Sequence, residues 1–592
     1  MTLVSSAGTT ADGGRPVNGG VVSWACHVGF PPSTIFPFTP PERIGIRNLL
    51  EFQALMYRPL YWLGKDGQPG VDYDLSLALP PQWSEDGRTV TVTLKPWQWS
   101  NGETICADNV MFWVNMMTVK SSRLGTFSPG YFPDNLTSYQ KVAEDQVRFT
   151  FDQAYSRDWV LMNQLTLIIP MPRAWDRTAD GPANASVDVA DIPAVYDFLL
   201  AEHGSWAEEN NADRGRWPSS PVWSVVNGPW RLKSFDLDGT VTFVPNDRYS
   251  GPNPAHLDEF RQVPIASDEA QYRALLAGPD TIQVGYLPHG MGAPAGEPDP
   301  LTKDFRLVPQ HIYMVHYMPL NFENPGLFGR VVRHAYFRQA LQCVMDQDTA
   351  IRDIFHGYAF VTSGPVPMRP DSGYVSPTQR ETPVTFDPQR ARQLLADSGW
   401  DVTRTPAVCV RPGAGPGCAG EGIEAGDKLS FTVRYVEGRS ALAQLMKQFQ
   451  ADAARVGIEL HLQEVFGSVL VAEDHGESSP EHPHSWELQC WNGGWSFYGK
   501  PTGEMLFKTR GGSNFGRYSD PRADELLNQI VVSDDPSTLY DYQDYLADQI
   551  PVVWTPGFPL RVLAVAHNLR GVEPINPYGT INPENWYYTT PE

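Results

Sequence analysis

The chain has 592 residues, with 45 Lys and Arg against 68 Asp and Glu, which gives a formal net charge of −23. At about 150 residues per domain, this length predicts several domain-sized units that bury large cores without needing a metal or a disulfide. So acidic a chain lacks the basic patches that nucleic acids and anionic membrane surfaces require. We therefore expect a folded, multidomain protein that binds no nucleic acid.

The N-terminal part begins with a polar segment and continues with β-structure. Residues 1–20 have neither the basic nor the apolar stretch of a signal peptide, so we expect a disordered leader, with any export signal or lipid anchor upstream of this chain. Residues 21–30 form a short apolar strand pattern. An Asp-Gly turn at 86–87 and the alternating apolar residues after it predict a β-hairpin over 83–105. Asp108 then fits the N-cap of a helix.

The middle of the chain alternates between loops and regular structure. Residues 173–220 are polar and broken, so we expect an insertion with one helix near 191–203. A second hairpin is predicted over 228–245, around the turn Asp238-Gly239. No run approaches the length of about 18 consecutive apolar residues that a transmembrane helix needs.

The clearest α/β signal lies between residues 386 and 465. Asp387 is a predicted N-cap, and Gly399 a predicted end, of one helix. Alternating apolar residues then predict strands around 429–435 and 458–462, with helical spacing between them. A strand, helix and strand in this order predict a parallel pair with a right-handed crossover.

The six cysteines form no CxxC pair, which argues against zinc-ribbon and thioredoxin sites. Cys409 and Cys418 flank the short Pro/Gly loop CVRPGAGPGC, and we predict a disulfide between them. Two reduced surface thiols are the alternative. The remaining cysteines lie in apolar surroundings typical of small core residues; they are Cys26, Cys106, Cys343 and Cys490.

The search for catalytic and metal motifs finds none that holds. GWSFYGKP at 494–501 resembles a phosphate-binding loop, but Pro501 stands where a Ser or Thr must bind magnesium. The HExxH and GxSxG patterns are absent from the sequence. Three histidines between 475 and 484 lie in a polar loop, where incidental histidines are the better interpretation than a metal site. We predict no metal, no cofactor and no catalytic residue.

An ordered series of motifs runs from about residue 50 to the C-terminus. It resembles the peptide/nickel class, family 5, of the extracellular solute-binding proteins that serve bacterial ABC importers. The stretches are YRPLYWLGKDGQ at 57–68 with the Trp, Asp-Gly and strand pattern of 83–102, GPW at 228–230, NDRY at 246–249, FRQALQCVMDQ at 337–347, FDPQRARQLLADSGW at 386–400 and YSDPRADELL at 518–527.

The resemblance implies an α/β, bilobed clamp of the periplasmic-binding-protein type, with mixed sheets in both lobes and an extra hairpin-rich subdomain in the first. Ligand is held between lobes that close about a hinge. The expected boundaries are 21–56, 221–317 and 555–592 for lobe I, 57–220 for its inserted subdomain, and 318–554 for lobe II. Such a protein is a monomeric, extracytoplasmic lipoprotein that delivers its ligand to a membrane permease and is not an enzyme.

The ligand-binding residues are predicted mainly in the segment 491–501. In peptide-binding relatives, an acid that follows a Gly-Trp pair grips the amino group of the peptide, but the corresponding position, at or near Tyr498, carries no acid here. Glu504 lies close by as a substitute. The aromatic residues of this segment are well suited to stack on a ligand; they are Trp491, Trp495, Phe497 and Tyr498.

Further ligand contacts are predicted at His27 and Phe30, after the first strand, and at Asn321, after the apolar run MVHYMPL. Oligopeptides or peptide-like solutes are the expected ligands. An oligosaccharide is the alternative, favoured by the aromatic residues and the missing acid. A secreted glycan-binding or glycan-hydrolysing protein is the alternative from another class.

Overall fold

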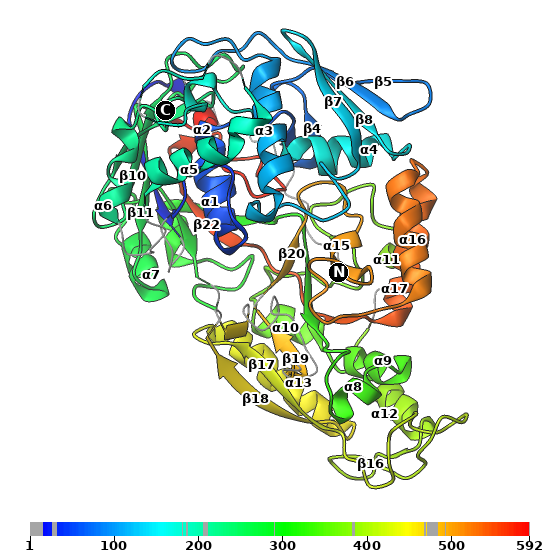
Figure 1. Ribbon diagram of the computed structural model, residues 1–592. Helices are drawn as coiled ribbons and strands as arrows, with labels where there is room; N and C mark the ends of the chain where they lie inside the picture. Colours follow the sequence, from blue (N-terminus) through cyan, green and yellow to red (C-terminus); the bar gives the residue numbers. More distant parts are fainter. Residues whose placement is uncertain are drawn as a thin grey trace.

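The computed structural model describes residues 16–26, 32–179, 181–184, 187–204, 211–288, 290–381, 385–466, 469–470, 484–491 and 493–590. The predictions for His27 and Phe30 lie outside these described residues. The fold is mixed α/β, and it is built on several separate sheets (Figure 1).

A seven-stranded mixed sheet joins the two ends of the chain to its middle. Strand β2 is parallel to both of its neighbours, and the other pairs are antiparallel. The hairpin predicted over 228–245 is confirmed as β9 and β10 of this sheet. In spatial order the strands are β13 (Phe305–Gln310), β22 (Arg561–Ala566), β12 (Val284–Leu287), β2 (Val21–Cys26), β11 (Glu259–Pro264), β10 (Val241–Pro245) and β9 (Trp230–Phe235).

The hairpin-rich region predicted in the first half is confirmed as a four-stranded antiparallel sheet next to a two-stranded one. Helix α3 (Ala107–Lys120) follows the predicted hairpin, but its N-cap is Cys106 and not Asp108. Asn109 completes this cap because its side chain accepts a hydrogen bond from the Cys106 backbone at 2.9 Å. The strands are β5 (Gln82–Trp83), β6 (Thr89–Thr93), β8 (Gln146–Phe151), β7 (Leu136–Ala143), β3 (Trp62–Lys65) and β4 (Gln68–Asp72).

The predicted βαβ unit is also confirmed. Strand β17 (Ser430–Val436) pairs in parallel with β18 (Glu459–Val465), and α13 (Ser440–Arg455) connects them. A third parallel strand, β19 (Leu488–Cys490), pairs with the other edge of β17. In Figure 1 this sheet lies at the opposite end of the molecule from β5 to β8. The other main helices are α5 (Ile192–His203), α7 (Asp268–Leu276), α8 (Leu327–Val331), α9 (Ala335–Cys343), α10 (Gln347–Asp353), α12 (Pro388–Asp397), α16 (Pro521–Val532) and α17 (Pro536–Gln549).

Two hydrophobic cores organise the chain. One contains buried residues from 22 to 308 together with 531 and 562–586, and the other contains 313–554 with 162 and 578. Strand β14 (Met314–Pro319) follows β13 and enters the second core, where it pairs with β20 (Gly494–Ser496) and β21 (Val552–Trp554). The boundaries proposed for the two lobes and for the inserted subdomain stay predictions.

The expectation of a disordered leader over residues 1–20 is wrong for residues 16–20. Pro16–Val17 forms β1, which pairs with β24 (Tyr587–Thr589) near the C-terminus. The backbone N–H of Gly20 also donates to the Asp258 carboxylate at 2.9 Å. Residues 16–20 are therefore part of the fold, because β24 near the C-terminus pairs with Pro16–Val17, and no local sequence signal indicates this partner. Residues 1–15 lie outside the described part of the chain.

The predicted disulfide is not formed, because Cys409 and Cys418 are both free thiols. The strand register explains the difference. Cys409 lies opposite Trp400 on one side, and its backbone N–H donates to the Asp427 carbonyl at 2.8 Å on the other. The loop is closed by backbone hydrogen bonds instead, including one from Ala419 to the Arg411 carbonyl at 2.9 Å.

No helix in the described ranges has the length and apolar character needed to span a membrane.

Candidate functional site

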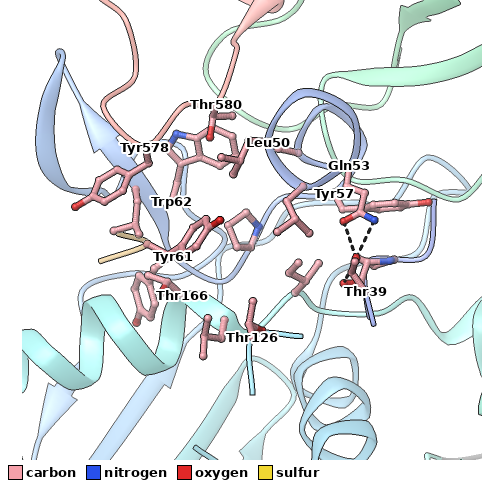
Figure 2. A pocket seen from close by; sticks show the side chains of 18 of the residues that line it. Thr39, Leu50, Gln53, Tyr57, Tyr61, Trp62, Thr126, Thr166, Tyr578 and Thr580 are labelled. Carbon is pink, nitrogen blue, oxygen red and sulfur yellow. Dashed lines mark hydrogen bonds between the residues drawn. The ribbon is translucent and has the colours of Figure 1, made fainter. Parts of the chain in front are cut away.

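The candidate site is a pair of adjoining cavities where elements of the two cores meet. The first cavity has a volume of about 930 Å³, part of it open to solvent. Figure 2 shows its side chains, which come from the segments before and after residue 60, from the region around 126 and 166, and from Tyr578 and Thr580. No charged residue is among the described residues that line it.

Aromatic rings dominate the wall of this first cavity. Tyr57, Tyr61 and Trp62 are each at most 3% exposed, and Trp113 of α3 closes the wall from another side. Tyr61 and Trp62 end the apolar stretch that leads into β3, so the sheet fixes where their rings lie. A cavity with such a lining favours apolar or flat groups of a ligand.

A buried polar cluster holds one side of the same cavity. The Gln53 amide, 2% exposed, donates to the Thr39 hydroxyl at 3.0 Å (Figure 2). It also donates to the carbonyl oxygen of Thr34 at 3.0 Å. Because Gln53 belongs to the π-helical segment Leu49–Gln53, these bonds join that helix to the preceding loop. These hydrogen bonds hold this wall in place before any ligand binds, because leaving the buried Gln53 amide without partners would cost free energy.

The second cavity has a volume of about 840 Å³, part of it open to solvent, and shares Thr126, Leu167 and Tyr498 with the first. Its walls come from residues 125–132 and 163–167 on one side and 495–506 on the other. Lys500 and Glu504 are the only charged residues among its described lining residues. Together the two cavities offer an aromatic and nearly uncharged space, in which the one cation and the one anion of the described lining both line the second cavity.

Beside the second cavity, one face of a short helical segment contacts Lys500 and Asp534. We call this contact region the seam. The segment comprises α4 (Arg157–Trp159) and the π-helical turns Val160–Gln164. Ser156, Trp159 and Asn163 recur at helical spacing, so their side chains lie on the same side. Ser156 donates to the Asp534 carboxylate at 2.6 Å, and Asn163 forms a two-way pair with the Lys500 backbone at 2.8 and 3.0 Å.

Glu504 is held inside the same seam. The Trp159 indole N–H donates to its carboxylate at 2.9 Å, and the residue is only 7% exposed. Glu504 begins the short helix α15 (Glu504–Phe507), directly after Gly503, whose positive φ of +76° turns the chain. One carboxylate oxygen of Glu504 therefore has a partner within the protein before any ligand binds.

The structure brings three of the four predicted aromatic residues to the cavities. Trp495 and Phe497 line the second cavity, and Tyr498 lines both. Trp491 instead packs edge-on against Tyr317 at 5.7 Å between ring centroids, and it lines neither cavity. Its predicted contact with ligand has no support from its position.

Asn321 also lies away from both cavities. Its side chain is 1% exposed and donates to the carbonyl oxygens of His484 and Trp486 at 2.9 and 2.8 Å. Its carboxamide oxygen accepts from the Glu323 backbone at 3.0 Å. These bonds give Asn321 a structural role as the connection between two loops.

Sequence reasoning missed several residues that line the cavities. The stretch YRPLYWLG, which contains Tyr57, Tyr61 and Trp62, contributes to the site as well as to the fold. The sequence signal for this part of the site was the close spacing of aromatic residues in this stretch. Tyr578 gave no such signal, because only the fold brings it beside Tyr498 in the cavity wall.

Burial shifts the ionisation of several groups around the second cavity. It raises the pKa of Tyr498 and of Tyr131, and the nearby Glu504 carboxylate raises that of Tyr131 further. Burial also lowers the pKa of Lys500, although Asp158, Asp534 and Glu504 partly oppose this shift. The common cause is poor solvation, which would strengthen any electrostatic contact that a ligand made in this cavity.

The nearest arrangement to a metal site in the described part of the chain lies elsewhere. Cys106, Asp108 and Glu144 place their potential ligand atoms within 4.8 Å of one another. The Lys141 ammonium lies 3.2 Å from Asp108 and 2.8 Å from Glu144. The single Lys141 ammonium forms ion pairs with both carboxylates, so the cluster has a simple structural explanation.

A mixed α/β chain with two cores and a cavity where they meet is the architecture of bilobed solute-binding proteins. The chain matches the family described as bacterial extracellular solute-binding proteins, family 5, over residues 73–516. The match covers well over half of the chain, and the protein belongs to this family.

Individual relatives are distant. The oligopeptide-binding protein AppA of Bacillus subtilis is 23% identical over 394 residues, which is 64% of this chain and 64% of AppA. The dipeptide-binding protein DppE of the same organism is 24% identical over 259 residues, 42% of this chain and 41% of DppE. The alignments thus span less than two thirds of each relative.

Solved structures resemble the whole chain more completely. AppA in complex with a nonapeptide gives a TM-score of 0.68 at 19% identity, covering 97% of this chain and 100% of AppA. The periplasmic EDTA-binding protein EppA gives 0.71 at 16% identity, with complete coverage of both chains. At these identities the likeness establishes the fold, and the two proteins bind chemically different ligands.

Proposed function

We propose that this protein is the extracytoplasmic solute-binding component of an ABC importer. It captures an oligopeptide or peptide-like solute between its two lobes and delivers it to the membrane permease. The observation that carries the proposal is the aromatic, nearly uncharged double cavity between the two cores, in a chain of this family. We further propose that it acts as a monomer and is anchored through a lipid upstream of residue 1.

The cavity lining fits side chains of a peptide better than a highly charged solute. Burying an aromatic or aliphatic side chain against such walls contributes about 1.5–3 kcal/mol. Threonine side chains in the lining offer hydrogen-bonding groups that are independent of peptide sequence; they are Thr39, Thr126, Thr166 and Thr580. This combination supports binding of varied peptides with apolar side chains.

Ligand-coupled closure is the direct test of this function. A ligand that binds only the closed form stabilises the protein by about 2.7 kcal/mol at a hundredfold excess over Kd. We expect mixed short peptides rich in Leu, Phe and Tyr to raise the Tm and to reduce the radius of gyration in small-angle scattering. A tightly bound peptide that leaves the radius unchanged would exclude the clamp.

A neutral oligosaccharide is the second candidate, and the aromatic faces favour it. Trp495→Ala should then remove a stacking surface and weaken sugar binding strongly, by about 3 kcal/mol. Glu504→Gln should matter little for a neutral sugar but should weaken binding of a peptide whose ammonium group reaches this carboxylate, by about 2–5 kcal/mol. Calorimetry of both variants against peptide and sugar panels separates the two candidates.

A further inference from the structure

Lys500 is a buried cation without a charged partner at the edge of the second cavity. The residue is 6% exposed and belongs to the cavity lining. Within the described ranges its ammonium group makes neither an ion pair nor a hydrogen bond, in contrast to Glu504, whose carboxylate accepts from Trp159. A buried ammonium without a close counter-ion is costly to a fold, so its position calls for an explanation.

The main chain of Lys500 is fixed more firmly than its ammonium group. Asn163 accepts from the Lys500 N–H at 2.8 Å and donates to the Lys500 carbonyl at 3.0 Å. The neighbouring Gly499 carbonyl accepts from the Tyr578 hydroxyl at 3.3 Å. The base of the side chain is thus held at the seam, where the flexible stem can present the charge to a ligand.

We propose that Lys500 binds a carboxylate of the ligand, so that this end of the site selects solutes with a free carboxylate. The inference rests on the proposed solute-binding function and specifies its substrate class. For a peptide, the group is the C-terminal carboxylate or an acidic side chain. The ligand then supplies the counter-ion that Lys500 lacks within the described residues.

The surrounding charges are consistent with this role. Asp158, Asp534 and Glu504 all act on the ammonium group of Lys500, but none of them forms an ion pair with it. Asp158 and Asp534 are exposed, so water screens their effect. A ligand carboxylate in the poorly solvated cavity would interact with Lys500 more strongly than either of them.

The test compares peptides that differ only in the proposed contact. Short peptides rich in Leu, Phe and Tyr are prepared as C-terminal acids and as C-terminal amides, and binding is measured by calorimetry. We expect the acids to bind about 10- to 100-fold more tightly, which is the effect of one hydrogen-bonded charge pair. Lys500→Met should abolish the difference and, because it removes a buried charge, should raise the Tm of the ligand-free protein.

Lys447→Met is the matched control, because Lys447 is an exposed lysine on α13 outside both cavities. It should preserve the preference for acids. Equal binding of acids and amides by the wild type, or an unchanged preference in Lys500→Met, would overturn the role of Lys500 while leaving peptide binding intact. Failure of both peptide forms to bind the wild type would refute the proposed peptide function and this contact with it.

Discussion

Replacement of Gly499 by alanine should separate the two sides of the seam. A Cβ atom at this position would lie 2.5 Å from the Met162 carbonyl oxygen and 2.5 Å from Oδ1 of Asn163. The backbone cannot yield as a flexible side chain does, so the two segments must move apart by roughly 1 Å. Overpacking of this kind costs about 1–3 kcal/mol. Loss of the two Asn163–Lys500 hydrogen bonds adds about 1 kcal/mol each.

Gly493→Ala is the control, because the nearest atom to a Cβ at this position is the Met314 sulfur at 4.0 Å. Urea unfolding followed by tryptophan fluorescence should show a lower midpoint for Gly499→Ala and an almost unchanged one for Gly493→Ala. The Gly499 variant should also bind ligand more weakly, since Lys500 and Glu504 shift together with the seam. Equal midpoints for the two variants would refute the close approach from which the cost was derived.

Three further predictions concern stability and reactivity. Glu584→Gln should destabilise the fold by about 3–5 kcal/mol in urea unfolding, because it removes the charged partner of the fully buried Arg58. The double variant Arg58→Met/Glu584→Gln should lose less stability than Glu584→Gln alone, and that result would confirm the pairing. Burial lowers the pKa of His203 from 6.5 to about 4. As the pH falls, His203 is therefore protonated in the unfolded chain at a higher pH than in the folded protein. The unfolding free energy should therefore fall as pH decreases from 6.5 toward 4, and His203→Gln should flatten that profile. Burial also raises the pKa of the Cys26 thiol to about 12, so iodoacetamide should spare Cys26 and modify the partly exposed Cys418 in the native protein, as peptide mass mapping would reveal.

Local sequence signals predicted much of the fold because they act over a few residues. The Asp238-Gly239 turn and the alternation around it sufficed for β9 and β10. The parallel pair β17 and β18 followed from strand and helix periodicity joined by a short connection. The pairing of Pro16–Val17 with β24 was missed because it depends on a partner more than 500 residues away.

The disulfide prediction shows the limit of spacing as evidence. A short loop between Cys409 and Cys418 is long enough for the sulfurs to meet, but strand register decides which residues lie opposite each other. In the fold Cys409 lies opposite Trp400, and Val408 also bridges Lys428. Strand register depends on the surrounding sheet, and the ten residues from Cys409 to Cys418 do not determine it.

The candidate site could be predicted only in part, because residues from separate segments of the chain line it. Trp495, Phe497, Tyr498 and Glu504 lie in one segment of the sequence and all line the second cavity, while their contact with ligand stays a prediction. Lys500 lies in the same segment, but the resemblance indicates only a missing acid there and gives no signal for a cation. Its significance emerges only from burial, cavity position and the absence of a counter-ion among the described residues, which are properties of the folded chain.

The distribution of charge along the double cavity implies an orientation for the ligand. Charged lining residues occur only in the second cavity, and the described lining of the first has none. If Lys500 binds a carboxylate, the apolar body of the solute extends past Tyr498, which both cavities share, toward Tyr61 and Trp62. A charged side chain carried into the first cavity would lose its hydration without gaining a counter-ion, at a cost of several kcal/mol. Under this proposal the double cavity would discriminate by where a solute carries its charge, and within that restriction its aromatic walls would accept varied apolar groups.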